Sequence, residues 1–75
     1  ADQVLEISKS NADVAMSNLE TAIKALEADK TEQNYNEAMR LYEIARQEVK
    51  VITEKDERES YQQRLENFRK RIVQP

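Results

Sequence analysis

The stretch that decides the fold is ALEADKTEQNYNEAMRLYEIA, residues 25–45. An apolar helical pattern ends within it, the polar patch ADKTEQN follows, and a second apolar pattern begins at Tyr35. Asn34 is a favourable N-cap residue, and Glu37 stands three positions later, where it completes a reciprocal capping box. These signals predict that one helix ends here and another begins. Because the stretch contains neither Gly nor Pro, a continuous helix across the patch is the alternative.

The segment before the polar patch has apolar residues at helical intervals of three or four. This spacing predicts a first helix over about residues 4–29. Ser10 and Asp13 form another capping pair, so the helix either begins near Ser10, after a separate lead-in, or runs unbroken from Asp2. The apolar positions of this helix are Leu5, Ala12, Ala15, Met16, Leu19, Ala22, Ile23 and Leu26.

The segment after the patch predicts a second helix over about residues 35–53. Its apolar seam alternates steps of three and four, as helix packing requires. A second apolar row lies roughly 100° away around the same helix. Two rows predict either two neighbouring helices or one neighbour and one open side. The seam is Tyr35, Ala38, Tyr42, Ala45, Val49 and Ile52, and the second row is Leu41, Ile44 and Val51.

A third helix is predicted over about residues 57–73. Asp56 and Glu59 form a capping pair at its start, and basic residues crowd its last turns, where cations suit the helix dipole. Three amphipathic helices joined by short links predict an all-α fold, a three-helix up-down-up antiparallel bundle that forms a single domain over residues 1–75. The apolar stripe of the third helix is Tyr61, Leu65, Phe68 and Ile72.

Composition excludes most kinds of chemical site. The chain has no Cys, His or Gly, which removes thiolate metal sites, the usual general base and phosphate-binding glycine loops. Its fifteen acidic residues are spread along polar helical faces, where they form ordinary helix-stabilising pairs. The net charge of −3 does not favour nucleic-acid binding, and no apolar run is long enough to span a membrane. We therefore expect a non-enzymatic protein without metal or cofactor.

The opening stretch resembles the corner between the first two helices of MIT domains, the microtubule-interacting and trafficking modules. That family typically shows an alanine-bearing helix that ends in an acidic-Asp-Lys run, then a polar turn and a Tyr-x-x-Ala-x-x-x-Tyr pattern. The segment YQQRLENFRKRI, residues 61–72, is similar to the third MIT helix. The resemblance covers about residues 12–73, and its corner is carried by Ala25, Ala28, Asp29, Lys30, Tyr35, Glu37, Ala38, Leu41, Tyr42 and Ala45.

This resemblance implies a monomeric adaptor that binds a short helical or extended motif in the tail of an ESCRT-III-type protein. It implies a cytoplasmic setting, at endosomes, with any peripheral membrane association supplied by a larger protein. We expect the ligand in a groove between the second and third helices, with leucines between apolar residues and charged residues paired with Glu48 and the arginines. The expected groove residues are Leu41, Ile44, Glu48 and Val51 on one wall, and Arg64, Leu65, Phe68 and Arg71 on the other.

Two alternatives remain open. The segment EVKVITEKDERESYQQRLENFRKRI, residues 48–72, resembles the end of the N-terminal three-helix domain of Vti-type SNARE proteins. That resemblance implies a regulatory domain that recognises a trafficking adaptor through a folded surface. The other alternative is a purely structural element, a helical hairpin or a coiled-coil oligomerisation unit. A monomer in solution favours the bundle over this last interpretation, because a continuous helix through residues 29–34 would expose its apolar seam.

Overall fold

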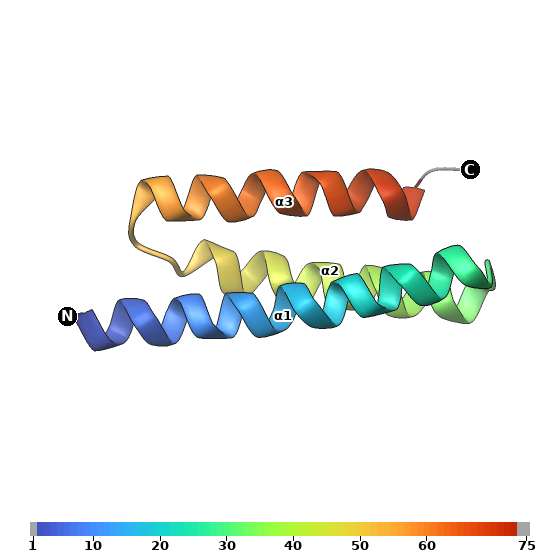
Figure 1. The fold of residues 1–75 in the computed structure, drawn as a ribbon, viewed down its shortest axis with the longest axis horizontal. Helices are drawn as coiled ribbons and strands as arrows, with labels where there is room; N and C mark the ends of the chain where they lie inside the picture. The colour runs from blue at the N-terminus through green and yellow to red at the C-terminus, as the bar shows by residue number, and fades with distance from the viewer. Residues whose placement is uncertain (1, 74–75) are drawn as a thin grey trace.

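The computed structural model describes the backbone of residues 2–73 and the side chains of residues 10–73. It contains three helices, α1 (Asp2–Ala28), α2 (Glu32–Lys50) and α3 (Lys55–Val73). Each helix runs antiparallel to the one before it, in an up-down-up arrangement (Figure 1). The predicted all-α three-helix bundle is confirmed, and the alternative of one continuous helix through the polar patch is wrong.

The first helix is the longest element of the fold. Of its two predicted starts, the unbroken one is right, because α1 runs as a single helix from Asp2 and the capping pair of Ser10 and Asp13 lies within it. The side chain of Leu5 lies outside the described residues. Since α1 has 27 residues and the other two helices have 19 each, α1 is longer by about 12 Å. Its N-terminal turns extend past the ends of both neighbours (Figure 1).

The turn between α1 and α2 corrects one prediction. The N-cap of α2 is Thr31, whose Oγ1 accepts a hydrogen bond from the backbone N–H of Asn34 at 3.1 Å. Asn34, the predicted N-cap, lies inside the helix. Its side-chain amide donates to the carbonyl oxygens of Asp29 at 2.8 Å and Ala25 at 3.4 Å. Because helix ends leave carbonyl groups without partners, Asn34 stabilises the end of α1 rather than the start of its own helix.

A continuous apolar core fills the space between the three helices. Small residues set the distance between α1 and α2, because buried alanines seven positions apart on each helix let the two backbones approach closely. They are Ala15 and Ala22 on α1, and Ala38 and Ala45 on α2. The rest of the core consists of Ala12, Met16, Leu19, Ile23, Leu26, Val49, Ile52, Tyr61, Leu65, Phe68 and Ile72.

The predicted seam of the second helix is only partly right. Its alanines and its last two members, Val49 and Ile52, are buried. Tyr42 is half-buried at the edge of the core, and Tyr35 is 40% exposed. Both tyrosines lie on one flank of the buried stripe, so they cover the core from the side of α3 rather than filling it.

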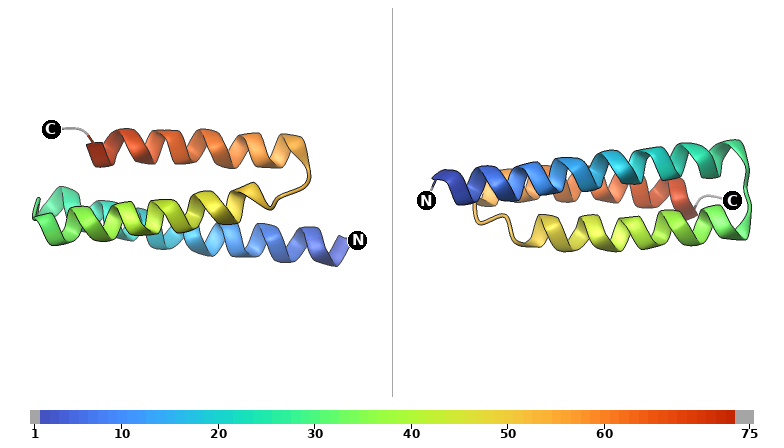
Figure 2. Two further views of the ribbon diagram at one scale, coloured as in Figure 1. Left: turned by 180° about the vertical axis from the view of Figure 1, so that it is seen from behind. Right: turned by 90° about the horizontal axis from the view of Figure 1, so that it is seen from below.

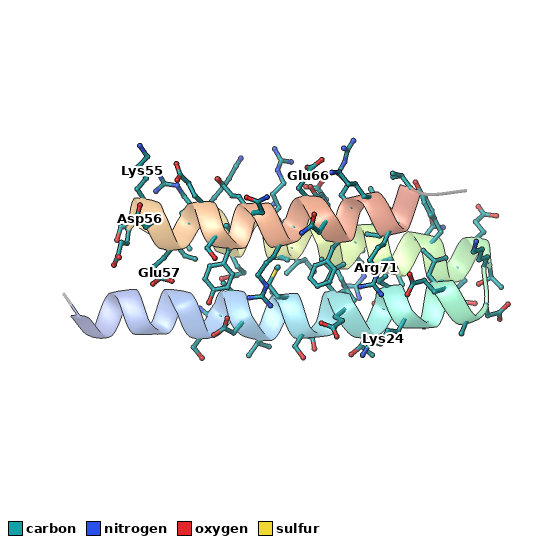
Figure 3. All side chains as sticks on the ribbon, turned by 45° about the horizontal axis from the view of Figure 1, so that its top comes forward. Lys24, Lys55, Asp56, Glu57, Glu66 and Arg71 are labelled. Carbon is teal, nitrogen blue, oxygen red and sulfur yellow. The ribbon has the colours of Figure 1, made fainter. Side chains whose placement is uncertain are left out.

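The third helix is attached by its predicted apolar stripe, all four members of which are buried. Polar contacts between described side chains also join it to α1. The hydroxyl of Tyr61 donates to the carboxylate of Asp13, and the guanidinium of Arg71 donates to both carboxylate oxygens of Glu27, at 2.6 and 3.2 Å. Figure 3 shows Arg71 reaching from α3 toward α1, whereas Lys24 points away from α3. The helix starts at Lys55, slightly before the predicted start, and its acidic first turn suits the helix dipole.

Candidate interaction surfaces

Hollows between the helices are the candidate sites that the described part of the chain offers. The side chains of residues 10–73 contain no group of three or more acidic residues that could hold a metal ion. No helix within residues 2–73 combines the length and apolar character needed to cross a membrane.

The structure divides the predicted groove residues between two different sides of α2. The side that meets α3 carries Tyr42, Arg46 and Val49. Two members of the second apolar row, Leu41 and Ile44, instead lie on the side away from α3, where they border α1. The prediction that these two residues form a wall of a groove between the second and third helices is therefore wrong.

A cleft of about 270 Å³ does lie between α2 and α3, and we call it the α2–α3 groove. Val49 and Leu65 are buried and form its apolar floor, with half-buried Tyr42 beside them. Two cations, Arg46 and Lys50, stand on the α2 rim. Of the predicted residues, only Leu65 lines this groove. The full lining is Tyr42, Arg46, Val49, Lys50, Gln62, Leu65 and Glu66.

The side-chain pairs at the rim of the α2–α3 groove are exposed and adaptable. Arg46 lies 3.4 Å from the carboxylate of Glu43, and Glu66 lies 3.9 Å from Arg69. Each of these side chains is about half exposed, so water screens both pairs and they contribute little to stability. Arg46 is therefore able to exchange Glu43 for a carboxylate of a ligand at small cost.

The two predicted arginines of α3 lie on its other flank. The guanidinium carbon of Arg71 is 5.8 Å from the ring centroid of Phe68, and that of Arg64 is 5.5 Å from the ring centroid of Tyr61. Such cation–π contacts cover the buried rings from the solvent side. The hydrogen bond from Arg71 lowers the pKa of the Glu27 carboxyl and raises that of the guanidinium. Arg71 therefore serves the contact between α1 and α3.

The side of the α1–α2 pair opposite α3 is uncovered, and we call it the open face. Figure 2, right, looks onto this side, with α3 behind the pair. Two shallow depressions, of about 380 and 240 Å³, join there because both are lined by Asn18. Ile44 is 42% exposed and Glu48 is half-buried on this face, whereas Val51 is 58% exposed at the C-cap of α2 and lines neither hollow. The lining is Asn11, Val14, Ala15, Asn18, Thr21, Ala22, Ala25, Glu37, Leu41, Ile44 and Glu48.

A further hollow, of about 480 Å³, lies at the end of the bundle where the α1–α2 turn meets the end of α3. Its charged lining residues are two acids and two bases, so it favours neither sign of ligand charge. Arg71 contributes to it but is already paired with Glu27. The hollow is lined by Leu26, Glu27, Lys30, Thr31, Glu32, Tyr35, Arg71, Ile72 and Val73.

The residues that sequence reasoning missed are the ones on the α3 side of α2. Arg46 and Lys50, four positions apart beside Val49, were a detectable signal, because that spacing places two cations next to an apolar residue on one side of a helix. The resemblances to MIT domains and to Vti-type SNAREs rest on the residues quoted above and stay predictions. Comparison with known proteins finds no family model, no curated protein and no solved structure that matches this chain.

Proposed function

We propose that this domain is a non-enzymatic adaptor module that binds a short, acidic, leucine-bearing helix of another protein in the α2–α3 groove. The observation that supports it most is the combination of an apolar floor, Val49 and Leu65, with a basic rim, Arg46 and Lys50. Recognition of an amphipathic helix by a hydrophobic groove between helices is a recurrent mode of peptide binding. The resemblance to MIT domains suggests the tail of an ESCRT-III-type protein as the ligand.

The groove suits such a ligand in two ways. A leucine side chain placed against Tyr42 and Leu65 removes apolar surface from water, which contributes about 25 cal/mol per Å² buried. Carboxylates on the flank of the ligand helix approach Arg46 and Lys50, and this charge pattern sets the orientation of the ligand and speeds its association. An interface of this size is small, so the complex is expected to be transient. Such an adaptor works in the cytoplasm, at endosomes, within a larger trafficking protein.

The test is an NMR titration of the ¹⁵N-labelled domain with a panel of ESCRT-III-type C-terminal tail peptides. We expect one peptide to shift the amide signals of Arg46, Gln62 and Leu65 and to saturate. Arg46→Glu should weaken that binding. Arg40→Glu is the matched control, because Arg40 also pairs with a glutamate three positions earlier on α2 but lies outside the groove.

A panel that causes no shifts, on a protein shown to be folded and monomeric, would overturn this proposal. Equal weakening by the two arginine variants would also overturn it, because the effect would then come from net charge and not from the α2–α3 groove. The first result would leave the SNARE-like and purely structural roles as the leading interpretations.

A further inference from the structure

The open face has the shape of a second helix-binding site. Two parallel rows of residues, each with steps of four, three and four, border it on the two helices. Each row spans eleven positions, which corresponds to a trough about 17 Å long, or roughly three helical turns. The row on α1 is Val14, Asn18, Thr21 and Ala25, and the row on α2 is Glu37, Leu41, Ile44 and Glu48.

The trough leaves apolar surface in contact with water. Val14 is 58% exposed and Ile44 is 42% exposed, and half-buried Leu41 lies between them and the turn. The floor is made of small side chains, Ala15 and Ala22, which let another helix backbone approach closely. The α1–α2 pair thus has one groove filled by α3 and one that remains unfilled. A helix laid in the trough would complete a four-helix bundle.

The charge of the trough is negative. Among the side chains of residues 10–73, its charged lining residues are two glutamates of α2, whereas the lining residues from α1 are neutral. Glu37 is already paired with Arg40. Glu48 is half-buried beside Ile44, and no described cation of residues 10–73 forms an ion pair with it. A carboxylate held against apolar surface without a counter-ion favours a ligand that brings a positive charge.

We infer that the open face binds a basic amphipathic helix of another protein. Its apolar side chains contact Val14, Leu41 and Ile44, and a lysine or arginine of the ligand pairs with Glu48. A second copy of this chain fits less well, because a two-fold dimer through this face would bring acidic residues of both chains into one interface. The inference is independent of the proposed function, since the α2–α3 groove selects the opposite ligand charge.

The test uses two synthetic helical peptides that share one leucine–alanine stripe and differ only in their flanking residues, lysine in one and glutamate in the other. We expect the lysine peptide to bind about tenfold more tightly by fluorescence anisotropy, because the contacts with both glutamates, Glu37 and Glu48, change sign together. In ¹⁵N spectra it should shift the amides of Asn18, Ile44 and Glu48. Added salt should weaken its binding.

Two variants locate the site. Glu48→Lys should weaken the lysine peptide about fivefold to tenfold, because it removes one attraction and adds one repulsion. Glu59→Lys is the matched control, since it makes the same charge change at an exposed position of α3 and should leave the affinity unchanged. Ile44→Asp should weaken the peptide by about tenfold, because losing an apolar contact and placing a carboxylate against the apolar stripe of the ligand costs more than the added attraction to an exposed lysine contributes. Circular dichroism should show native helicity for all three variants.

Three results would overturn the inference. The first is equal affinity for the two peptides, and the second is a set of shifts confined to the α2–α3 groove. The third is a dimer in sedimentation equilibrium that Ile44→Asp converts to a monomer, which would assign the open face to a second copy of the chain. Failure of the ESCRT-III-type tail titration would leave this inference intact, because that titration probes the other side of α2.

Discussion

The contact between Tyr61 and Asp13 offers the sharpest test of how α3 is held. The tyrosine is 8% exposed, and its hydroxyl donates to a carboxylate on α1 that lies 48 positions earlier in the chain. Tyr61→Phe removes this hydrogen bond and keeps the ring, its packing and its contact with Arg64. The change therefore isolates one polar link between the first and the last helix.

The expected loss follows from the surroundings of the two groups. A hydrogen bond to a charged group contributes about 1.5–3 kcal/mol to stability. Asp13 lies at the exposed edge of the contact, so its carboxylate returns to water when the hydroxyl is removed and no buried group is left without a partner. We therefore expect Tyr61→Phe to lower the free energy of unfolding by about 1.5 kcal/mol, the lower end of that range. A loss of this size lowers Tm by about 6–12 °C in a domain of this size.

The pH dependence supplies a second measurement. Burial, followed by the hydrogen bond to Asp13, raises the pKa of Tyr61 from 10.0 to about 12. The unfolded chain therefore loses this proton first as pH rises, and the contribution of the neutral hydroxyl is fully present below pH 10 and is lost between pH 10 and 12. The stability difference between the wild type and Tyr61→Phe should narrow over this interval.

The assay is urea unfolding followed by circular dichroism, for the wild type, Tyr61→Phe, Asp13→Ala and the double variant. A coupling energy of about 1 kcal/mol or more is expected between the two sites. Tyr42→Phe is the control, because no described residue bonds that half-buried hydroxyl, and its effect should stay within about 0.5 kcal/mol. Two results together would refute the assigned role of the Tyr61–Asp13 hydrogen bond. They are a coupling energy below about 0.3 kcal/mol and a stability difference between the wild type and Tyr61→Phe that stays constant with pH.

Three further outcomes follow from the fold. Asn34→Ala and Thr31→Ala should each lower the free energy of unfolding in urea by about 1 kcal/mol, since the first removes the two hydrogen bonds of the Asn34 amide and the second removes the N-cap hydrogen bond of α2. The hydrogen bond from Arg71 lowers the pKa of the Glu27 carboxyl, so its ionised form stabilises the fold above pH 4.5, and this stabilisation is lost as pH falls through the lowered pKa. Thermal melts from about pH 3 to 7 should therefore show that Glu27→Gln lowers Tm at the upper end of this range and has less effect at the lower end. Leu65→Ala should cost about 2–5 kcal/mol in urea unfolding, because it leaves a cavity in a thin core.

Much of the fold could be predicted because apolar spacing is a local property of the chain. The stripe of α3, Tyr61 to Ile72, was fully predictable, since four residues at steps of four and three have one way to face a core. The start of α2 was not. Thr31 and Asn34 are both good capping residues three positions apart, and the choice between them depends on which carbonyl groups of α1 lie within reach of the Asn34 amide.

The candidate site was harder to predict from the sequence, because the apolar pattern of α2 does not indicate which flank of this helix contacts α3. The third helix can return on either side of the α1–α2 pair, and both arrangements bury the same stripe. In the structure it returns on the side of Tyr42 and Arg46, which leaves Leu41 and Ile44 on the open face. The prediction placed Leu41 and Ile44 together on one flank of the helix and assigned α3 to that flank, whereas α3 lies on the flank of Tyr42 and Arg46.

The close alanine packing of α1 against α2 has a consequence for the order of folding. Helices joined by a short turn make contacts that are local in sequence, and such contacts form quickly. The third helix adds four buried side chains at greater sequence distance. We therefore expect α3 to open and reclose as a unit while the α1–α2 hairpin persists, with faster amide hydrogen exchange in α3. The α2–α3 groove then exists only while α3 is docked, whereas the open face is available in both states.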